Sequence, residues 1–137
     1  MLKFIYGKSS MAYLDIAHPD LQVVMHDALG TDILDISIID SHRNEAKQNR
    51  LYDLKKSKVR WPNGKHNKMP SDAVDAAPFI NGKVSWNKMH CCVLAGIILT
   101  CAAKRGIKIR WGGNWDMDGE PITDQDFQDL VHFERVT

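Results

Sequence analysis

The sequence predicts an α+β fold, in which a small antiparallel sheet has helices packed on one side. Three observations predict it. Segments rich in β-branched residues are interleaved with segments of helical periodicity. The connections between them are short and hairpin-like, as is typical of antiparallel sheets. The chain of 137 residues contains no repeats or linker-like stretches, so we expect one domain over residues 1–137.

The first half of the chain predicts two helices on either side of one strand. Residues 19–29 carry apolar side chains at helical spacing, and Gly30 follows as a stop signal. Residues 34–39 are rich in isoleucine and predict a strand. Residues 44–56 are polar and helix-forming. Three apolar side chains of this segment are expected to face the core: Ala46, Leu51 and Leu54.

The second half predicts three strands and the longest helix. Residues 61–72 contain two prolines and form a loop, and residues 73–80 predict a strand that ends at an Asn-Gly turn. Residues 86–105 predict a broadly apolar helix that is capped by Gly106. A short strand, a loop rich in Gly and Asp, and a final strand are expected at residues 107–111, 112–126 and 131–136.

The composition is that of an ordinary globular protein. Hydrophobic residues make up 44% and charged residues 26%, and 18 Lys and Arg against 17 Asp and Glu leave a net charge of +1. Bulk charge therefore gives no reason to expect nucleic acid as a partner. Residues 91–103 are too short an apolar run to span a bilayer, so we expect no membrane insertion. The N-terminus lacks the apolar core of a signal peptide, and we expect a soluble monomer.

The three cysteines and one basic segment each have a plain interpretation. Cys91, Cys92 and Cys101 fall in one apolar segment, which indicates buried free thiols in a reducing cytoplasm. Residues 55–60 carry four basic side chains next to the candidate site. They form a solvated loop in one interpretation and attract an anionic polymer in the other.

Three distant residues form a candidate zinc site. His66, Asp75 and His132 supply two imidazoles and one carboxylate, which can hold zinc and leave a fourth position for water. Small residues flank Asp75 and leave room on its face of the strand, so the zinc site is expected on the sheet. Asp129 lies three residues before His132, a turn ahead of the final strand, where its carboxylate can take a proton from that water.

Alternatives to this site remain open from the residues alone. A histidine in a Gly-Lys-His-Asn loop is often just exposed to solvent, whereas burying an unpaired carboxylate at Asp75 costs several kcal/mol. Asp72 is a rival ligand. A second metal, calcium, is conceivable where oxygen ligands alternate before a glycine. The residues of that loop are Asn114, Asp116, Asp118 and Gly119.

Four segments resemble the M15 family of zinc peptidases. These peptidases include D-alanyl-D-alanine carboxypeptidases and phage L-alanyl-D-glutamate endopeptidases, and the resemblance covers about residues 37–136. Residues 40–48 are similar to the arginine-and-glutamine segment of the family, and residues 65–75 are similar to its first metal-binding segment. Residues 110–116 and 129–134 resemble the C-terminal part of the phage endolysin branch.

The resemblance implies a role for each matching residue. His66, Asp75 and His132 are implied to bind zinc, and Asp129 is implied to be the catalytic base and acid. The implied role of Arg43 is to meet a substrate carboxylate or the developing oxyanion, which suits its planar donors. The implied role of Gln48 is to bind substrate, by orienting that arginine or the peptide.

The expected function is that of a phage endolysin which hydrolyses the L-alanyl-D-glutamate bond of the peptidoglycan stem peptide. Such a protein would accumulate in the host cytoplasm and reach the cell wall through a membrane lesion made by another protein. Two alternatives remain: a D-alanyl-D-alanine carboxypeptidase with the same metal centre, and a catalytically silent module that binds the wall or belongs to the virion.

Overall fold

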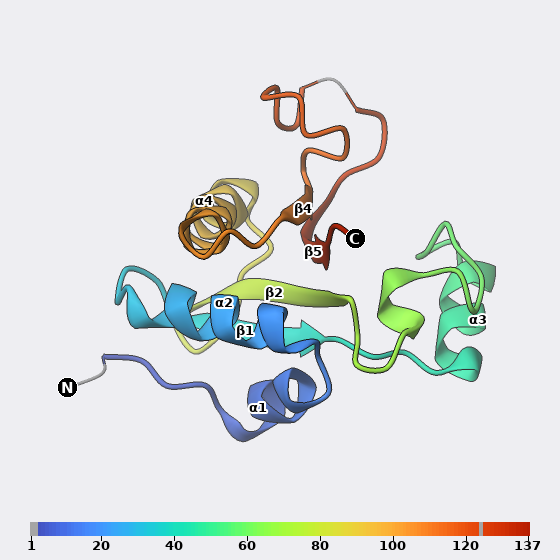
Figure 1. Cartoon of the computed structure of the whole chain (residues 1–137), viewed down its shortest axis with the longest axis horizontal. Helices are drawn as coiled ribbons and strands as arrows, with labels where there is room; N and C mark the ends of the chain where they lie inside the picture. The colour runs from blue at the N-terminus through green and yellow to red at the C-terminus, as the bar shows by residue number, and fades with distance from the viewer. Residues whose placement is uncertain (1–2, 124) are drawn as a thin grey trace.

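The computed structural model describes residues 3–123 and 125–137, which form an antiparallel sheet with four helices (Figure 1). The strand order is β1-β2-β5-β4, and β3 pairs with the C-terminal end of β2. This arrangement confirms the α+β prediction. The helices are α1 (Lys8–Asp15), α2 (Pro19–Gly30), α3 (Glu45–Asp53) and α4 (Lys88–Lys104), with a 3-10 turn η1 (Lys65–Asn67). The strands are β1 (Ile36–Asp40), β2 (Ala73–Ile80), β3 (Lys83–Val84), β4 (Ile109–Gly112) and β5 (Asp129–Arg135).

Strand β2 is the centre of the sheet and has the bounds that the sequence predicts. Its first six residues are buried, as expected for a strand with a partner on each side. The strand ends at Asn81 and Gly82, whose φ angles of 53° and 78° form the turn into β3. Because side chains alternate along a strand, Val74 and Ala76 join the main core, while Asp75 lies on the opposite face.

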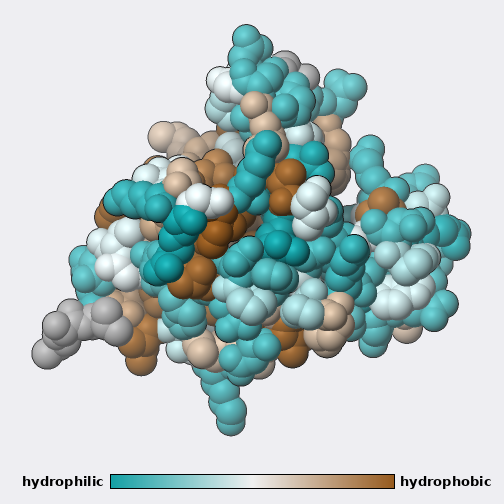
Figure 2. Space-filling view, in the orientation of Figure 1, coloured by the Kyte–Doolittle hydropathy of each residue, from teal (hydrophilic) through white to brown (hydrophobic). Residues whose placement is uncertain are grey.

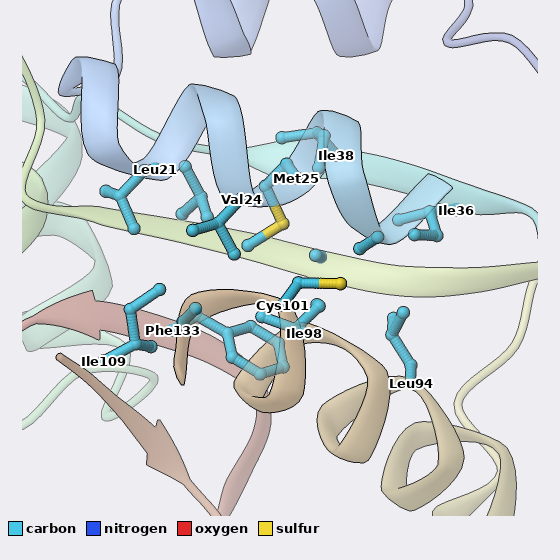
Figure 3. Packing of buried hydrophobic residues seen from close by; sticks show 14 of the residues in the cluster. Leu21, Val24, Met25, Ile36, Ile38, Leu94, Ile98, Cys101, Ile109 and Phe133 are labelled. Carbon is cyan, nitrogen blue, oxygen red and sulfur yellow. The ribbon is translucent and has the colours of Figure 1, made fainter. Parts of the chain in front are cut away.

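Helices α2 and α4 cover the apolar face of the sheet. Figure 3 shows Val24 and Met25 of α2 close to Ile98 of α4 and Phe133 of β5, and these side chains are fully buried. Asn87 caps the start of α4 by accepting hydrogen bonds from backbone N–H groups. Gly106 ends the helix with a φ of +69°, a conformation that suits glycine.

Helix α1 is an element that the sequence patterns did not indicate. It has eight residues, no side-chain cap at its start and only two buried residues. One of them, Ser10, accepts a hydrogen bond from the backbone N–H of Ile38, which joins α1 to β1. Leu14, the other, belongs to the main core. This helix depends on tertiary contacts more than on its own pattern.

Helix α3 forms where it was expected, but the prediction of its buried face was wrong. Ala46 and Leu54 are exposed, and Leu51 is only partly buried. Gln48 is the one buried residue of the helix. Helix α3 lies away from α2 and α4, at the end of the molecule that Figure 2 shows as largely hydrophilic. A helix that packs on a polar loop and not on the core needs no apolar stripe.

No helix among the described residues is both long and apolar enough to cross a bilayer. All three cysteines are free, and Cys91 and Cys101 are buried as predicted, while Cys92 is partly buried.

Candidate metal centre and its cleft

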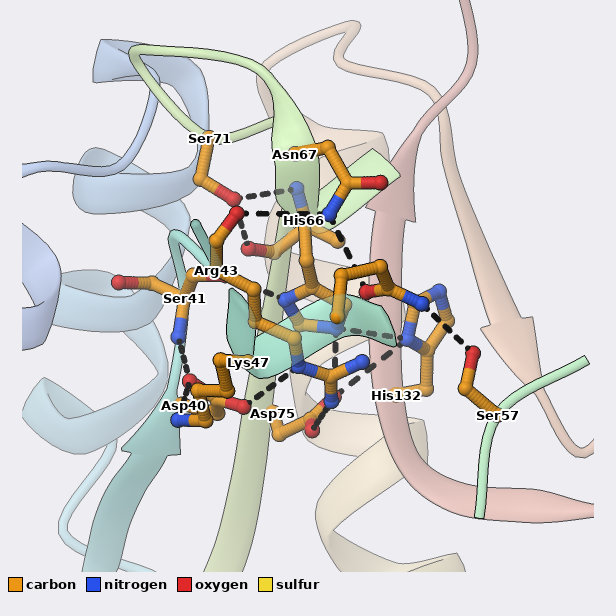
Figure 4. A network of polar contacts seen from close by, with 12 residues as sticks. Asp40, Ser41, Arg43, Lys47, Ser57, His66, Asn67, Ser71, Asp75 and His132 are labelled. Atoms are coloured by element: carbon orange, nitrogen blue, oxygen red, sulfur yellow. Dashed lines mark hydrogen bonds and ion pairs between the residues drawn. The ribbon is translucent and has the colours of Figure 1, made fainter. Parts of the chain in front are cut away.

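Three side chains from three separate elements converge on one point of the polar face of the sheet (Figure 4). His66 comes from η1, Asp75 from β2 and His132 from β5, and all three are buried. The Nε2 of His66 lies 3.2 Å from the Nδ1 of His132. The Oδ1 of Asp75 lies 3.2 Å from the first nitrogen and 3.4 Å from the second. Such a group can hold a metal ion.

Sheet register brings two of these residues together. Asp75 and His132 are direct partners in the antiparallel pair of β2 and β5, so their side chains leave the same face side by side. Backbone hydrogen bonds hold the third residue against them. The carbonyl of His66 accepts from the N–H of Arg43 at 2.7 Å, and the turn of η1 is closed by Asn67, whose Oδ1 accepts from the N–H of Gly64 at 2.8 Å.

The far nitrogen of each imidazole is tied to an acceptor, and this fixes which nitrogen carries the proton. The Nδ1–H of His66 donates to the carbonyl of Ser41. The Nε2–H of His132 donates to the Oε1 of Glu134 at 2.8 Å. When both rings are neutral, the lone pairs of the other two nitrogens therefore face each other and the carboxylate of Asp75. Lone pairs that converge without a donor between them are typical of a cation site.

The two oxygens of the Asp75 carboxylate lie in different environments. Its Oδ2 accepts from the Nη2 of Arg43 at 3.2 Å. Its Oδ1 is buried and has no hydrogen bond of acceptable geometry with any described residue. Burial alone would raise the pKa of Asp75, but the adjacent imidazoles outweigh burial and hold it well below the ordinary value. Asp75 is therefore a carboxylate that stays ionised and points one oxygen at the two histidines.

His132 has the opposite pKa shift. Burial would lower its pKa, but the adjacent carboxylates of Asp75 and Glu134 outweigh burial and raise it to about 9. Glu134 in turn is held by Arg110, whose Nη2 donates to its Oε2 at 2.7 Å. The pKa of Glu134 falls to about 2, because His132 and Arg110 together overcome the effect of burial.

Arg43 lies in the site, but its guanidinium is already paired. Its Nε donates to the Oδ2 of Asp40 at 2.7 Å, in addition to its contact with Asp75. A bulge in β1 after Ile38 turns Asp40 to the polar face, opposite Asp75. The structure therefore places Arg43 where it orients a candidate metal ligand. Its predicted contact with substrate stays a prediction.

Asp129 lies on the same cleft and begins strand β5, so the expectation of a turn before the final strand was wrong. A bulge opposite Gly112 sets the position of Asp129 in the β4–β5 pair. A Cβ at residue 112 would lie 2.0 Å from the carbonyl oxygen of Asp129, so only glycine allows this approach. Burial raises the pKa of Asp129, the charge of Asp75 raises it further, and nearby cationic groups partly offset both. A carboxylate of raised pKa is a better proton acceptor near neutral pH.

The cluster opens into a cleft of about 390 Å³. Trp115 forms one wall, with its ring centroid 5.4 Å from that of His132. Phe127 stacks on Trp115 at a centroid distance of 6.0 Å. The cleft is large enough for a short peptide segment with a few polar contacts.

Gln48 also lines the cleft, yet it is only 1% exposed and all its polar atoms are used. Its Nε2 donates to the hydroxyl of Ser57 at 2.9 Å and to the carbonyl of Val59 at 2.6 Å. Its Oε1 accepts from the Nδ2 of Asn67 at 3.1 Å. Gln48 thus connects the segment after α3 to the turn that carries His66, and its predicted contact with substrate stays a prediction.

The other candidate ligands lie outside the cluster. Asp72, the rival of Asp75, is buried and accepts from the Nε of Arg135 at 3.2 Å. In the loop considered for calcium, Asp116 and Asp118 each accept a hydrogen bond from the backbone N–H two residues later. The Oδ1 of Asn114 is buried without a hydrogen-bond partner among the described residues.

Sequence reasoning placed Glu134 on the face of His132 but gave it no role. The alternation of the strand was the signal, because residues two apart on one face can form a hydrogen bond. It also left out the carbonyl of Ser41, which no pattern of side chains can reveal. Trp115 could have lined a groove or packed on the core from its residue type alone, and its stacking on Phe127 depends on the path of a long loop that spacing does not indicate.

Comparisons with known proteins identify the family of this chain. The chain matches the family model of the phage L-alanyl-D-glutamate peptidases over residues 2–136. It is 32% identical over 120 residues to the L-alanyl-D-glutamate peptidase of Escherichia phage T5, a match that covers 87% of each chain. It is also similar to the crystal structure of the L-Ala D-Glu endopeptidase ChiX of Serratia marcescens. The TM-score is 0.79 at 25% identity, over 98% of this chain and 92% of that one.

Proposed function

Because the chain belongs to the family of phage L-alanyl-D-glutamate peptidases, we propose that it is a zinc-dependent endopeptidase of the peptidoglycan stem peptide. The bond cut is that between L-alanine and D-glutamate, which the names of its relatives specify. The observation that carries the metal part of this proposal is the convergence of His66, Asp75 and His132 with their lone pairs turned inward.

The distances within the cluster support zinc. Ligands about 2.0–2.1 Å from a tetrahedral zinc ion lie about 3.3–3.4 Å from one another. The three ligand atoms here are separated by 3.2, 3.2 and 3.4 Å. Two imidazoles with one carboxylate are also a common donor set of catalytic zinc, and the buried Oδ1 of Asp75 gains a partner when a cation binds. A zinc ion in this position would polarise the scissile carbonyl and lower the pKa of water toward about 7.

The side chains of the cleft supply the remaining chemistry. Asp129 accepts a proton from the attacking water and returns it to the leaving amine of D-glutamate, so one carboxylate serves as base and then as acid. Its raised pKa suits both steps. Arg43 and Glu134 hold Asp75 and His132 in place. Trp115 covers one side of His132 and limits the access of bulk water.

We also propose that the protein acts as an endolysin, which reaches the wall from the host cytoplasm at lysis. The phage origin of its relative supports this role. The single domain and the monomeric state expected from the sequence are part of the same proposal.

Mass spectrometry of purified peptidoglycan after digestion tests the activity and the bond together. The expected products are free stem peptides that begin with D-glutamate, together with glycan strands that keep L-alanine. Release of terminal D-alanine would instead assign a carboxypeptidase. An unchanged digest with zinc-loaded protein would assign a silent wall-binding module.

The role of Asp129 is tested by Asp129→Ala. We expect this variant to bind zinc as the wild type does and to lose hydrolysis by about 10²–10⁴-fold, because general base catalysis supplies a factor of that order. Metal content and the rate of muropeptide cleavage are measured on the same preparation. A variant that still cleaves at more than a tenth of the wild-type rate would refute the assignment of the base.

Calcium in the loop that contains Asn114, Asp116 and Asp118 is a separate hypothesis. The buried Oδ1 of Asn114, which has no hydrogen-bond partner among the described residues, supports it, since a cation would provide one. Calorimetric titration with calcium should show one site in the wild type and none in Asn114→Ala. A wild-type titration without heat would reject it.

A further inference from the structure

Cationic side chains outnumber anionic ones along the cleft. Among the described residues that line it, the only carboxylates are Asp129 and Glu134. The five cationic side chains are Arg43, Lys56, Lys58, Lys65 and Arg110. Only those cations that have no partner within the protein remain available to a substrate.

Three of the five cations already have partners. Arg43 is paired with two carboxylates, as described above. Arg110 donates to Glu134. The Nζ of Lys65 donates to the carbonyl of Arg135 at 3.2 Å and so holds the C-terminal segment. These three side chains serve the architecture of the site.

Lys56 and Lys58 form no ion pair with any described residue. Both are exposed, and both lie in the basic segment at residues 55–60. Lys58 differs from Lys56 in having an aromatic contact: its Nζ lies 5.0 Å from the centroid of the Phe127 ring. An ammonium group over a ring face is held by the ring and keeps its N–H donors for an anion.

The backbone on both sides of Lys58 is also held. The buried amide of Gln48 binds the hydroxyl of Ser57 and the carbonyl of Val59, the residues before and after it. The same amide contacts Asn67, next to a candidate metal ligand. The position of Lys58 relative to the metal cluster is therefore set by a rigid connection and not by a free loop.

An aromatic row leads from Lys58 to the metal cluster. Phe127 lies under the ammonium group and stacks on Trp115, and Trp115 contacts His132. The ammonium group therefore lies at the end of the aromatic wall away from the cluster, on the same cleft. The sequence left two interpretations of residues 55–60 open, a solvated loop and an attractor of anions. The structure places the charge of Lys58, in this segment, at the cleft.

We propose that Lys58 is a specificity-determining residue, which binds the free α-carboxylate of the D-glutamate in the stem peptide. This inference rests on the proposed function. A D-glutamate that continues the chain through its γ-carboxyl leaves its α-carboxylate free, and this is the anionic group nearest to the scissile bond. The enzyme then prefers stem peptides with the free acid over those in which this carboxyl is amidated.

Steady-state kinetics on two soluble stem peptides test the proposal with zinc-loaded protein. One peptide has the free α-carboxylate of D-glutamate, and the other has the α-carboxamide. The wild type should favour the free acid in kcat/KM. Lys58→Ala should raise KM for the free acid about fivefold, in the range of an exposed ion pair, with kcat and the amidated peptide unaffected. Lys58→Arg should retain the preference, and Lys58→Glu should reverse it.

Lys68→Ala is the matched control, because Lys68 is equally exposed and does not line the cleft. It should behave as the wild type with both peptides. If Lys58→Ala keeps the wild-type preference while the L-alanyl-D-glutamate bond is still cut, the assignment of Lys58 is wrong and the proposed function stands. If the wild type cuts neither peptide, both fail.

Discussion

At the residue scale, the chemistry of the site depends on the two imidazole nitrogens that point away from the cluster, the Nδ1 of His66 and the Nε2 of His132. The backbone carbonyl of Ser41 and the carboxylate of Glu134 each accept a hydrogen bond from one imidazole, so that in the neutral rings the lone pairs of His66 and His132 are directed at Asp75. Without these acceptors, either ring is free to turn a proton toward the cluster and repel a cation. The acceptors therefore determine the metal site as much as the ligands do.

His132 gives a pH dependence that can be measured. Its pKa of about 9 in the metal-free protein lies above the ordinary 6.5, so at neutral pH a bound metal must displace a proton. We expect apparent zinc affinity to rise about tenfold per pH unit below about pH 9 and then to level off. Competition with a chelator of known affinity, repeated from pH 6 to pH 10, measures this slope.

Glu134→Gln is the control for this prediction. Glutamine can still accept the hydrogen bond, but it removes the charge that supports the protonated imidazole. The pH at which affinity levels off should therefore fall in this variant. An affinity that does not change with pH in the wild type would show that no ligand proton is displaced.

At the element scale, two bulges adapt an ordinary antiparallel sheet to carry a site. The bulge in β1 turns Asp40 to the polar face, and the bulge between β4 and β5 positions Asp129. The second bulge requires Gly112, since any Cβ there would collide with the backbone of β5. The position of Asp129, the proposed base, thus depends on a residue without a side chain.

We expect Gly112→Ala to destabilise the protein by about 2–4 kcal/mol and to reduce hydrolysis, because the β4–β5 pair must separate to accept the methyl group. Gly96→Ala is the matched control, since its added Cβ would meet nothing within 4 Å in the exposed face of α4. It should stabilise by about 0.5–1 kcal/mol through helix propensity. Denaturant unfolding of both variants checks this. Equal stabilities would contradict the close approach.

The sequence predicted elements well where their patterns are local. Strand β2 was predicted at its observed bounds, because small apolar residues end at an Asn-Gly turn. Helix α1 was missed and the buried face of α3 was wrong, since both are determined by what they pack against. For the site, residue types and the family resemblance singled out His66, Asp75 and His132, which the fold brings together, and their role as ligands stays a prediction. The pairing of Arg43 and the burial of Gln48 required the fold, because each partner comes from a distant segment.

At the scale of the whole molecule, the metal cluster joins segments that are far apart in the chain. His66 and His132 are separated by 66 residues, and their elements meet only in the folded state. A cation at this point binds the native protein and not the unfolded chain, so it stabilises the fold by mass action.

Removal of metal should therefore lower the melting temperature. A free zinc concentration about 100 times the Kd contributes about 2.7 kcal/mol, which corresponds to roughly 9 °C for a domain of this size. Calorimetric scans before and after chelation measure the shift, and His132→Ala should show almost none. A wild-type melting curve that is unchanged after verified metal removal would contradict the linkage.

A crystal structure of the zinc-loaded protein, with anomalous data collected at the zinc absorption edge, tests the central claim most directly. We predict one strong anomalous peak, bound by the Nε2 of His66, the Oδ1 of Asp75 and the Nδ1 of His132, with Asp129 facing the open side. A peak on other residues, or no peak at saturating zinc, would contradict the assignment of this cluster as the metal centre.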